Sequence, residues 1–170
     1  MNIFYLDEDV SICAKYHADS HVIKMILESA QILCTALALH GIKTPYRPTH
    51  LKHLCVLWVA ESIDNWVWLK ELMLELDREY RYRWNKSNAH KSVLAVKSLT
   101  FLKVGYVRNI GITERPQAMP EKYKVRGDPI TAYRKYYTIE KSHLHKYTKR
   151  NKPYWIEQLY IQRPLKVRHY

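Results

Sequence analysis

The clearest pattern of hydrophobic and polar positions lies between residues 19 and 40. Apolar side chains occur on nearly every turn of this segment, Asp19 or Ser20 can cap its first turn, and Gly41 can end it. A helix that is apolar on almost all sides is buried on almost all sides. The pattern therefore predicts a central core helix from Asp19 to about His40.

Helical periodicity continues through most of the remaining chain, and strand signals are weak. The further expected helices are His50 to about Trp84 with a candidate break at Ser62–Asn65, Ala89–Leu99, Asp128–Leu144 with Asp128 as N-cap and Pro129 as first helical residue, and Trp155–Ile161. Glycine and proline residues in the segment Gly105–Gly127 predict a long ordered loop. Residues 1–18 are ambiguous, because Ile3–Tyr5 can begin a short extended segment that ends in the acidic turn Asp7–Asp9.

These patterns predict an all-α fold: a single compact domain, residues 1–170, of about five helices, with the long loop ahead of the C-terminal basic helices. A chain of this length buries enough surface to fold without a disulfide or a structural metal. Three cysteines are widely spaced in apolar segments, which indicates reduced core residues: Cys13, Cys34 and Cys55.

The composition also bears on where the protein acts. No apolar run approaches the roughly 18 residues that would span a bilayer, and no apolar segment follows a basic start as in a secretory signal. We therefore expect a cytoplasmic protein without a membrane partner, in the host cytoplasm if the source is a virus. We expect no cofactor.

Positive charge is concentrated in the C-terminal part of the chain. The formal net charge is +12, with 12 Lys and Arg against 11 Asp and Glu in residues 1–100 but 16 against 5 in residues 101–170. Such a surface favours a polyanion, because each phosphate that is neutralised releases condensed counterions. DNA is the expected partner, RNA or a nucleotide is an alternative, and a basic surface kept for solubility is the non-functional interpretation.

Five polar residues of the core helix recur at intervals of three and four: His21, Lys24, Glu28, Gln31 and Thr35. This spacing places them on one helix face, in successive turns. Because unpaired buried polar groups cost about 1–3 kcal/mol each, such a stripe must meet partners, water or a ligand. Its histidine, lysine and glutamate can supply acid, base and amine nucleophile, so His21, Lys24 and Glu28 are the candidate catalytic residues. The alternative is a solvated stripe with an ordinary ion pair between Lys24 and Glu28.

Four histidines stand at spacings that would suit pairs of metal ligands. His17 lies four residues before His21, and His50 lies three residues before His53. No carboxylate stands beside them at a characteristic spacing to complete a ligand set. Helix capping and hydrogen bonding are the commoner roles of such histidines, so we predict no metal site.

Tyrosine is abundant, at 14 residues, and many tyrosines stand next to Lys or Arg in the C-terminal half. Cations can contact phosphates while rings stack on exposed or flipped bases, at about 1–3 kcal/mol per stacked base. About half of the tyrosines on the Asp128 helix must face the core, because they cannot all face outward. The candidate nucleic-acid-binding residues are His17, Arg47, His50, Lys122, Lys124, Arg134, Lys141, Lys149, Arg150 and Trp155.

His21 and Glu28 stand seven residues apart in the sequence Asp-Ser-His-Val-Ile-Lys-Met-Ile-Leu-Glu. Further short pieces follow in order: Thr49, His50 and His53 before the second helix, Asp64, Leu69, Glu79 and Arg83 within it, and Lys149, Arg150, Pro153, Tyr154 and Trp155 near the C-terminal end. Together these pieces, spread over most of the chain, resemble the phage endonuclease V type of pyrimidine dimer DNA glycosylase. In that family a catalytic glutamate follows a histidine by seven residues at the start of the first helix.

The resemblance implies an all-α DNA-binding enzyme that flips a nucleotide, attacks the sugar C1′ with an amine and uses the glutamate in glycosidic cleavage and strand elimination. In that family the amine is the α-amine of a small residue exposed by removal of the initiator methionine. Here the second residue is Asn2, whose size is expected to leave Met1 in place. More residues also precede the histidine, and Leu27 and Gln31 stand where the family has arginines. Lys24 is a candidate for the missing amine.

We therefore expect an enzyme of DNA repair or modification that acts on a base or N-glycosidic bond, of the DNA glycosylase or abasic-site lyase type, with Glu28 and His21 at its reaction centre. A non-catalytic nucleic-acid-binding protein on the same scaffold is one alternative. An enzyme that acts on nucleotides is another. The leading hypothesis requires that the core helix turns its polar stripe toward a cavity overlooked by the cationic C-terminal region.

Overall fold

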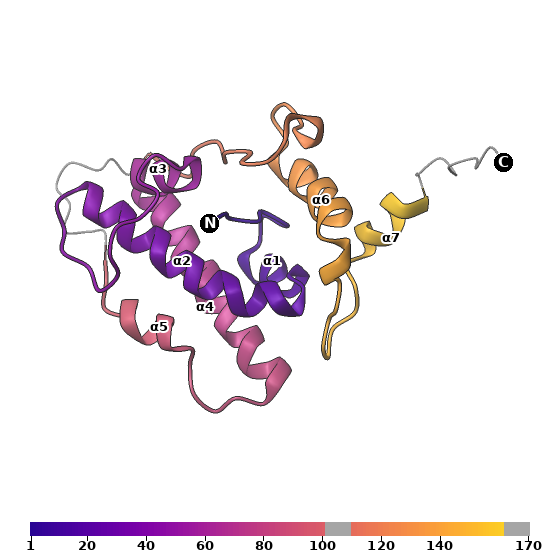
Figure 1. The fold of residues 1–170 in the computed structure, drawn as a ribbon, viewed down its shortest axis with the longest axis horizontal. Coiled ribbons are helices and arrows are strands. Elements are labelled where there is room, and N and C mark those ends of the chain that lie inside the picture. Colours follow the sequence, from indigo (N-terminus) through magenta and orange to yellow (C-terminus); the bar gives the residue numbers. More distant parts are fainter. Residues whose placement is uncertain (101–109, 162–170) are drawn as a thin grey trace.

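The computed structural model describes residues 1–100 and 110–161, and its regular structure is helical throughout these two ranges (Figure 1). The elements are α1 (Val10–Tyr16), α2 (Asp19–Leu39), α3 (Leu54–Glu61), α4 (Ile63–Trp84), α5 (Lys91–Val96), α6 (Pro129–Glu140) and α7 (Tyr154–Ile161), with 3₁₀ turns η1 (Glu121–Tyr123) and η2 (Ser142–Leu144). The all-α prediction is confirmed. The sequence pattern does not predict α1.

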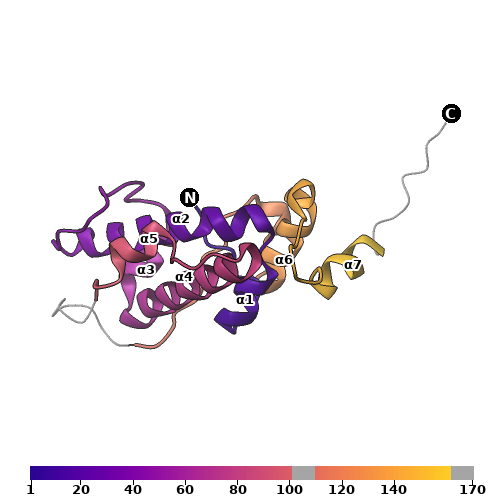
Figure 2. The same cartoon turned by 90° about the horizontal axis from the view of Figure 1, so that it is seen from below.

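The two longest helices, α2 and α4, pack against each other and form the centre of the core (Figures 1 and 2). The shorter helices α1, α3 and α5 pack around this pair. The indole N–H of Trp66 on α4 donates to the carbonyl of Leu33 on α2 at 3.2 Å and joins the pair directly. Of the 21 residues of α2, 14 are buried, so most of this helix lies in the core.

The first six residues run as an extended segment between this helical core and α6 (Figure 1). Tyr5 is completely buried, and its ring centroid lies 5.5 Å from that of Trp58, 5.3 Å from that of Trp68 and 5.2 Å from that of Tyr133 on α6. Aromatic pairs at such distances stabilise a core beyond the area that they bury. The N-terminal segment is thus a structural layer that joins α6 to the rest of the protein.

The boundaries of α2 differ from the sequence prediction at the N-terminal end. The N-cap residue is Ala18, and no side chain caps the first turn. Asp19, one of the two expected caps, instead accepts hydrogen bonds from Arg83 and from Thr148. Gly41 follows the other end with φ of +78°, as expected for a residue that stops a helix.

The second long helical pattern is divided by Ser62 into α3 and α4, as the candidate break predicts. The Ser62 hydroxyl accepts from the backbone N–H of Asp64 at 3.2 Å and caps α4. Helix α3 begins at Leu54 and not at the predicted His50, because the ring of His53 caps α3 and the residues before it form a turn.

The C-terminal elements begin close to the predicted positions. Asp128 caps α6 by accepting from Thr131 N at 2.9 Å, but α6 ends at Glu140 and a 3₁₀ turn replaces the expected helix up to Leu144. Of the predicted loop Gly105–Gly127, residues 105–109 lie outside the described residues, and residues 110–127 are irregular apart from η1.

Helix α2 is long and apolar enough to cross a membrane when only length and composition are considered. It has 21 residues, and 67% of its most apolar window is buried inside the protein. The same test is passed by the core helix of a soluble protein. The finding is therefore weak evidence for a membrane span.

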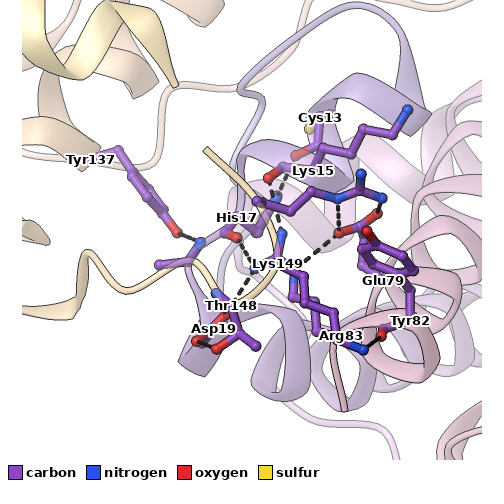
Figure 3. Close-up of polar contacts among 12 residues, drawn as sticks. Cys13, Lys15, His17, Asp19, Glu79, Tyr82, Arg83, Tyr137, Thr148 and Lys149 are labelled. Carbon is purple, nitrogen blue, oxygen red and sulfur yellow. Dashed lines mark hydrogen bonds and ion pairs between the residues drawn. The ribbon is translucent and has the colours of Figure 1, made fainter. Parts of the chain in front are cut away.

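Arg83 near the end of α4 connects three parts of the fold (Figure 3). Its side chain is 0% exposed, and its guanidinium donates to the carboxylates of Glu79 at 3.0 Å and Asp19 at 3.1 Å. It also donates to the carbonyls of His17 at 2.8 Å and Lys15 at 3.0 Å. A buried charge is tolerated when it is paired and hydrogen-bonded in this way. The network fixes the junction of α1 and α2 on α4.

Replacing Arg83 by leucine should lower the free energy of unfolding by about 3–5 kcal/mol, because two buried carboxylates would lose their shared partner. The matched control is Arg78→Leu, since the Arg78 side chain on the same helix is 65% exposed and pairs with Glu75 at the surface. Arg78→Leu should lower the free energy of unfolding by less than about 1 kcal/mol. Urea unfolding monitored by circular dichroism measures both values, and equal losses would contradict the buried-network account.

Candidate functional site

The polar stripe predicted on α2 is divided by its surroundings into buried and exposed members. His21, Glu28 and Thr35 are buried, Gln31 is half-buried, and Lys24 is exposed. The apolar residues Ile23 and Leu27 are 41% and 39% exposed, so α2 is not buried on nearly all sides as the pattern predicts. His21 is covered by α6 and Glu28 by the N-terminal segment, whereas Lys24 between them faces solvent.

Glu28 lies beside the start of the chain. Its Oε2 atom accepts from the backbone N–H of Asn2 at 3.0 Å and lies 3.7 Å from the terminal amine of Met1. Its Oε1 atom lies 3.4 Å from the Nζ atom of Lys24. The carboxylate side chain is 12% exposed, whereas that of Lys24 is 65% exposed. One nearly buried carboxylate thus meets two primary amines.

Asn2 holds the chain terminus in this position, a role that no sequence pattern signals. Its side-chain N–H group donates to the carbonyl of Ala118 at 3.2 Å. Its side-chain oxygen accepts from the hydroxyl of Tyr133 at 3.1 Å and lies 3.5 Å from the thiol of Cys55. Three segments far apart in sequence therefore converge on the second residue, and the terminal amine is fixed beside Glu28.

His21 faces α6, about two helical turns before Glu28 on α2. Its Nδ1 atom lies 2.8 Å from the hydroxyl of Tyr137, and its ring stacks on Phe4 at 4.8 Å. Burial lowers the pKa of His21 to about 3, with smaller contributions in the same direction from His17, Lys141 and Lys24. The ring is neutral and a weak base at physiological pH, so its role there is to orient a neighbour by hydrogen bonding.

His17, a candidate nucleic-acid contact, is placed in the core. Its side chain is 0% exposed, and its Nδ1 atom lies 2.8 Å from the carbonyl of Cys13, which can only accept. Burial lowers the pKa of His17 to about 4, and the nearby Arg83 guanidinium acts in the same direction. In this conformation His17 contributes to folding and does not reach solvent.

The loop that carries Arg47 and His50 contacts the C-terminal end of the polar stripe, at Thr35. Both residues are exposed. The backbone N–H of Thr49 donates to the Thr35 hydroxyl at 3.2 Å, which joins the loop to the last turn of the stripe. Burial lowers the pKa of His53, the terminal amine and His50 lower it further, and Glu28 opposes them. The thiol of Cys55, two residues after His53, lies 3.5 Å from the side-chain oxygen of Asn2, so the end of this loop adjoins the N-terminal segment.

Three of the C-terminal candidates make specific contacts within the protein. Arg134 donates to the Leu6 carbonyl and pairs with Asp7, both at 2.8 Å. Arg150 pairs with Glu79 at 2.6 Å and covers the ring of Tyr82. Lys149 donates to the carbonyl of Tyr82 at 2.9 Å. The contacts of Arg150 and Lys149 lie on α4, so the structure does not bring these two cations together with Glu28.

The other C-terminal candidates lie on or near α6. Lys122 and Lys124 are exposed and pair with Glu140 and Glu121. The amine of Lys141 lies 5.3 Å above the ring of Tyr136. Trp155 is 4% exposed and lies under the guanidinium of Arg134, so its ring belongs to the core. Two tyrosines of α6 reach the region of the stripe. Tyr133 hydrogen-bonds to Asn2, and Tyr137 hydrogen-bonds to His21.

The structure also bears on metal binding and on the state of the cysteines. Within residues 1–100 and 110–161, no group of three or more His, Cys, Asp or Glu side chains is arranged to hold a metal ion. All three cysteines are free and buried.

Comparisons with protein-family models, with curated proteins and with solved structures find no match to the chain.

The buried histidines make stability depend on pH. The folded-state pKa of His17 lies below its unfolded value of 6.5, so its contribution is fully present above pH 6.5 and is lost as pH falls toward 4. Between pH 7.5 and pH 5 this loss amounts to about 2 kcal/mol in the free energy of unfolding. His17→Asn, which retains a donor for the Cys13 carbonyl, should flatten the profile by that amount.

The exposed His143 supplies the control, because His143→Asn should leave the pH profile of unfolding unchanged. Denaturant unfolding at the two pH values measures each variant. Parallel profiles for wild type and His17→Asn would contradict the assignment of a buried neutral ring.

Proposed function

We propose that the protein is an enzyme that acts on DNA at a base or N-glycosidic bond, of the DNA glycosylase and abasic-site lyase type. The observation that carries this proposal is the position of Glu28, with Lys24 Nζ 3.4 Å from one carboxylate oxygen and the terminal amine of Met1 3.7 Å from the other. A primary amine beside a carboxylate is the chemistry needed for imine formation at a sugar carbon.

The reaction follows from these groups. An unprotonated amine attacks the sugar C1′, the bond from C1′ to the base breaks, and the base leaves with the bonding electrons. After the sugar ring opens, C1′ and the amine nitrogen share a double bond. Loss of a proton from C2′ then expels the 3′ phosphate and cuts the strand. Glu28 takes the proton that the attacking amine loses and passes it to the ring oxygen O4′ as the ring opens, while the departing base takes a proton from water. Water finally hydrolyses the imine and frees the amine.

The terminal amine is the more firmly held nucleophile of the two. The Met1 side chain is 4% exposed beside the carboxylate, whereas that of Lys24 is 65% exposed. If Met1 were removed, the nitrogen of Asn2 would become the α-amine, and it already lies 3.0 Å from Glu28. Both forms of the chain therefore place a terminal amine at this carboxylate. Lys24, with a side chain that is 65% exposed, is the alternative nucleophile.

The position of the reaction centre agrees with a polyanionic substrate. The net charge of +12 attracts DNA as a whole, and the exposed Arg47 and His50 lie on the loop that contacts the polar stripe at Thr35. The resemblance to the endonuclease V type of glycosylase supports DNA as the substrate, because the spacing of His21 and Glu28 is part of that resemblance. DNA repair or modification is therefore the proposed setting.

Glu28→Gln should keep DNA binding and lower turnover on abasic-site duplex by about 10²–10⁴-fold, because the amide cannot take a proton. Fluorescence anisotropy measures binding, and strand cleavage measures turnover. Glu71→Gln is the matched control, since Glu71 is exposed on α4, and it should behave as wild type. Cleavage by Glu28→Gln at the wild-type rate would refute the proposed reaction centre and favour a non-catalytic nucleic-acid-binding protein.

A further inference from the structure

The loop between α2 and α3 combines positive charge with exposed leucines. Between Glu28 and Glu61 the sequence contains no acidic residue, and the loop contributes the cations Lys43, Arg47 and Lys52 together with His50 and His53. Leu51, in the turn just before α3, is 47% exposed. An exposed apolar residue flanked by cations is complementary to a nucleic acid, because the phosphates can bind the cations while the apolar side chain contacts the bases.

The exposed apolar surface continues onto α3. Leu54 and Leu57, one turn apart on that helix, are 52% and 47% exposed. An open cavity of about 640 Å³ lies within the loop itself and is lined by Pro48–His53. Single exposed leucines are ordinary, but three within seven residues, next to a cavity and three cations, form a binding surface.

The loop is held in place by hydrogen bonds at several points. The Tyr46 hydroxyl donates to the Ser92 hydroxyl at 3.1 Å, and the N–H of His53 donates to the carbonyl of His50 at 2.8 Å. His50 has φ of +52°, which turns the chain sharply just before Leu51. A loop that is already ordered loses little conformational entropy on binding.

The loop also adjoins the proposed reaction centre. Its anchor at Thr35 lies on the polar stripe, and the thiol of Cys55, just after the loop, lies 3.5 Å from the side-chain oxygen of Asn2, whose backbone N–H binds Glu28. An enzyme that attacks C1′ must first take the nucleotide out of the base stack, at a cost that apolar side chains inserted between base steps can offset.

On the basis of the proposed function, we propose that Leu51 inserts into the base stack of duplex DNA beside the reacting nucleotide, while Arg47 and Lys52 bind the flanking phosphates. The loop is thus a wedge that unstacks the duplex next to Glu28. Its occupant is double-stranded DNA, which differs from a single strand in having a continuous stack to open.

The test uses a duplex with 2-aminopurine next to an abasic site, whose fluorescence rises when the base is unstacked. Glu28→Gln protein, added until anisotropy shows saturation, should raise this fluorescence without any chemistry. Adding Leu51→Ala to that protein should lower the ratio of unstacked to stacked base by about tenfold. Adding Leu94→Ala, a leucine of α5 that is 60% exposed, should change nothing.

The outcomes separate the wedge from the proposed function. Equal 2-aminopurine signals for Leu51→Ala and its parent, with wild-type protein still cleaving abasic DNA, overturn the wedge and leave the reaction centre intact. Leu51→Ala that alters self-association in sedimentation experiments but not the DNA signal overturns it as well, and assigns the loop to contacts between copies. Wild-type protein that does not bind duplex overturns both.

Discussion

The site depends on the fixation of the chain terminus beside Glu28. The amide and carbonyl of the Asn2 side chain bind Ala118 and Tyr133, and its backbone N–H binds the carboxylate directly. A buried carboxylate is costly unless it is paired, so the terminal amine and Glu28 stabilise each other in this position. The buried ring of Tyr5 then ties the same segment to the helical core, so that the terminal amine belongs to a rigid part of the fold.

A second buried network holds the frame on which this site is built. Arg83 fixes the beginning of α2 on α4, and Asp19 also receives the Thr148 side chain from the C-terminal part. The cations predicted to bind DNA are divided by these contacts: Arg134 and Arg150 serve internal ion pairs, whereas the loop with Arg47 stays exposed next to Glu28. The loop after α2 thus contributes an exposed positive surface that the C-terminal arginines Arg134 and Arg150 do not.

The sequence predicts the helices well because their signals are local. The Gly41 stop, the Ser62 break and the Asp128 cap each depend on one residue and its neighbours. It does not predict contacts that join distant segments. The role of Asn2 depends on Ala118 and Tyr133, more than one hundred residues away, and the burial of Arg83 depends on Asp19. The helix dipole alone accounts for an arginine at the end of α4, so nothing in the sequence singles out Arg83 as the buried one. The spacing of His21, Lys24 and Glu28 predicts one helix face and the pairing of Lys24 with Glu28, but only the fold places the terminal amine beside the same carboxylate.

The most direct measurement is to trap wild-type protein on abasic-site duplex with borohydride and to map the adduct by mass spectrometry after trypsin digestion. A reduced imine on the amine at the start of the chain, within the tryptic peptide that ends at Lys15, is the predicted result. The absence of any adduct, or an adduct found on lysine side chains alone, would contradict the claim that the fold holds the terminal amine at Glu28 for catalysis.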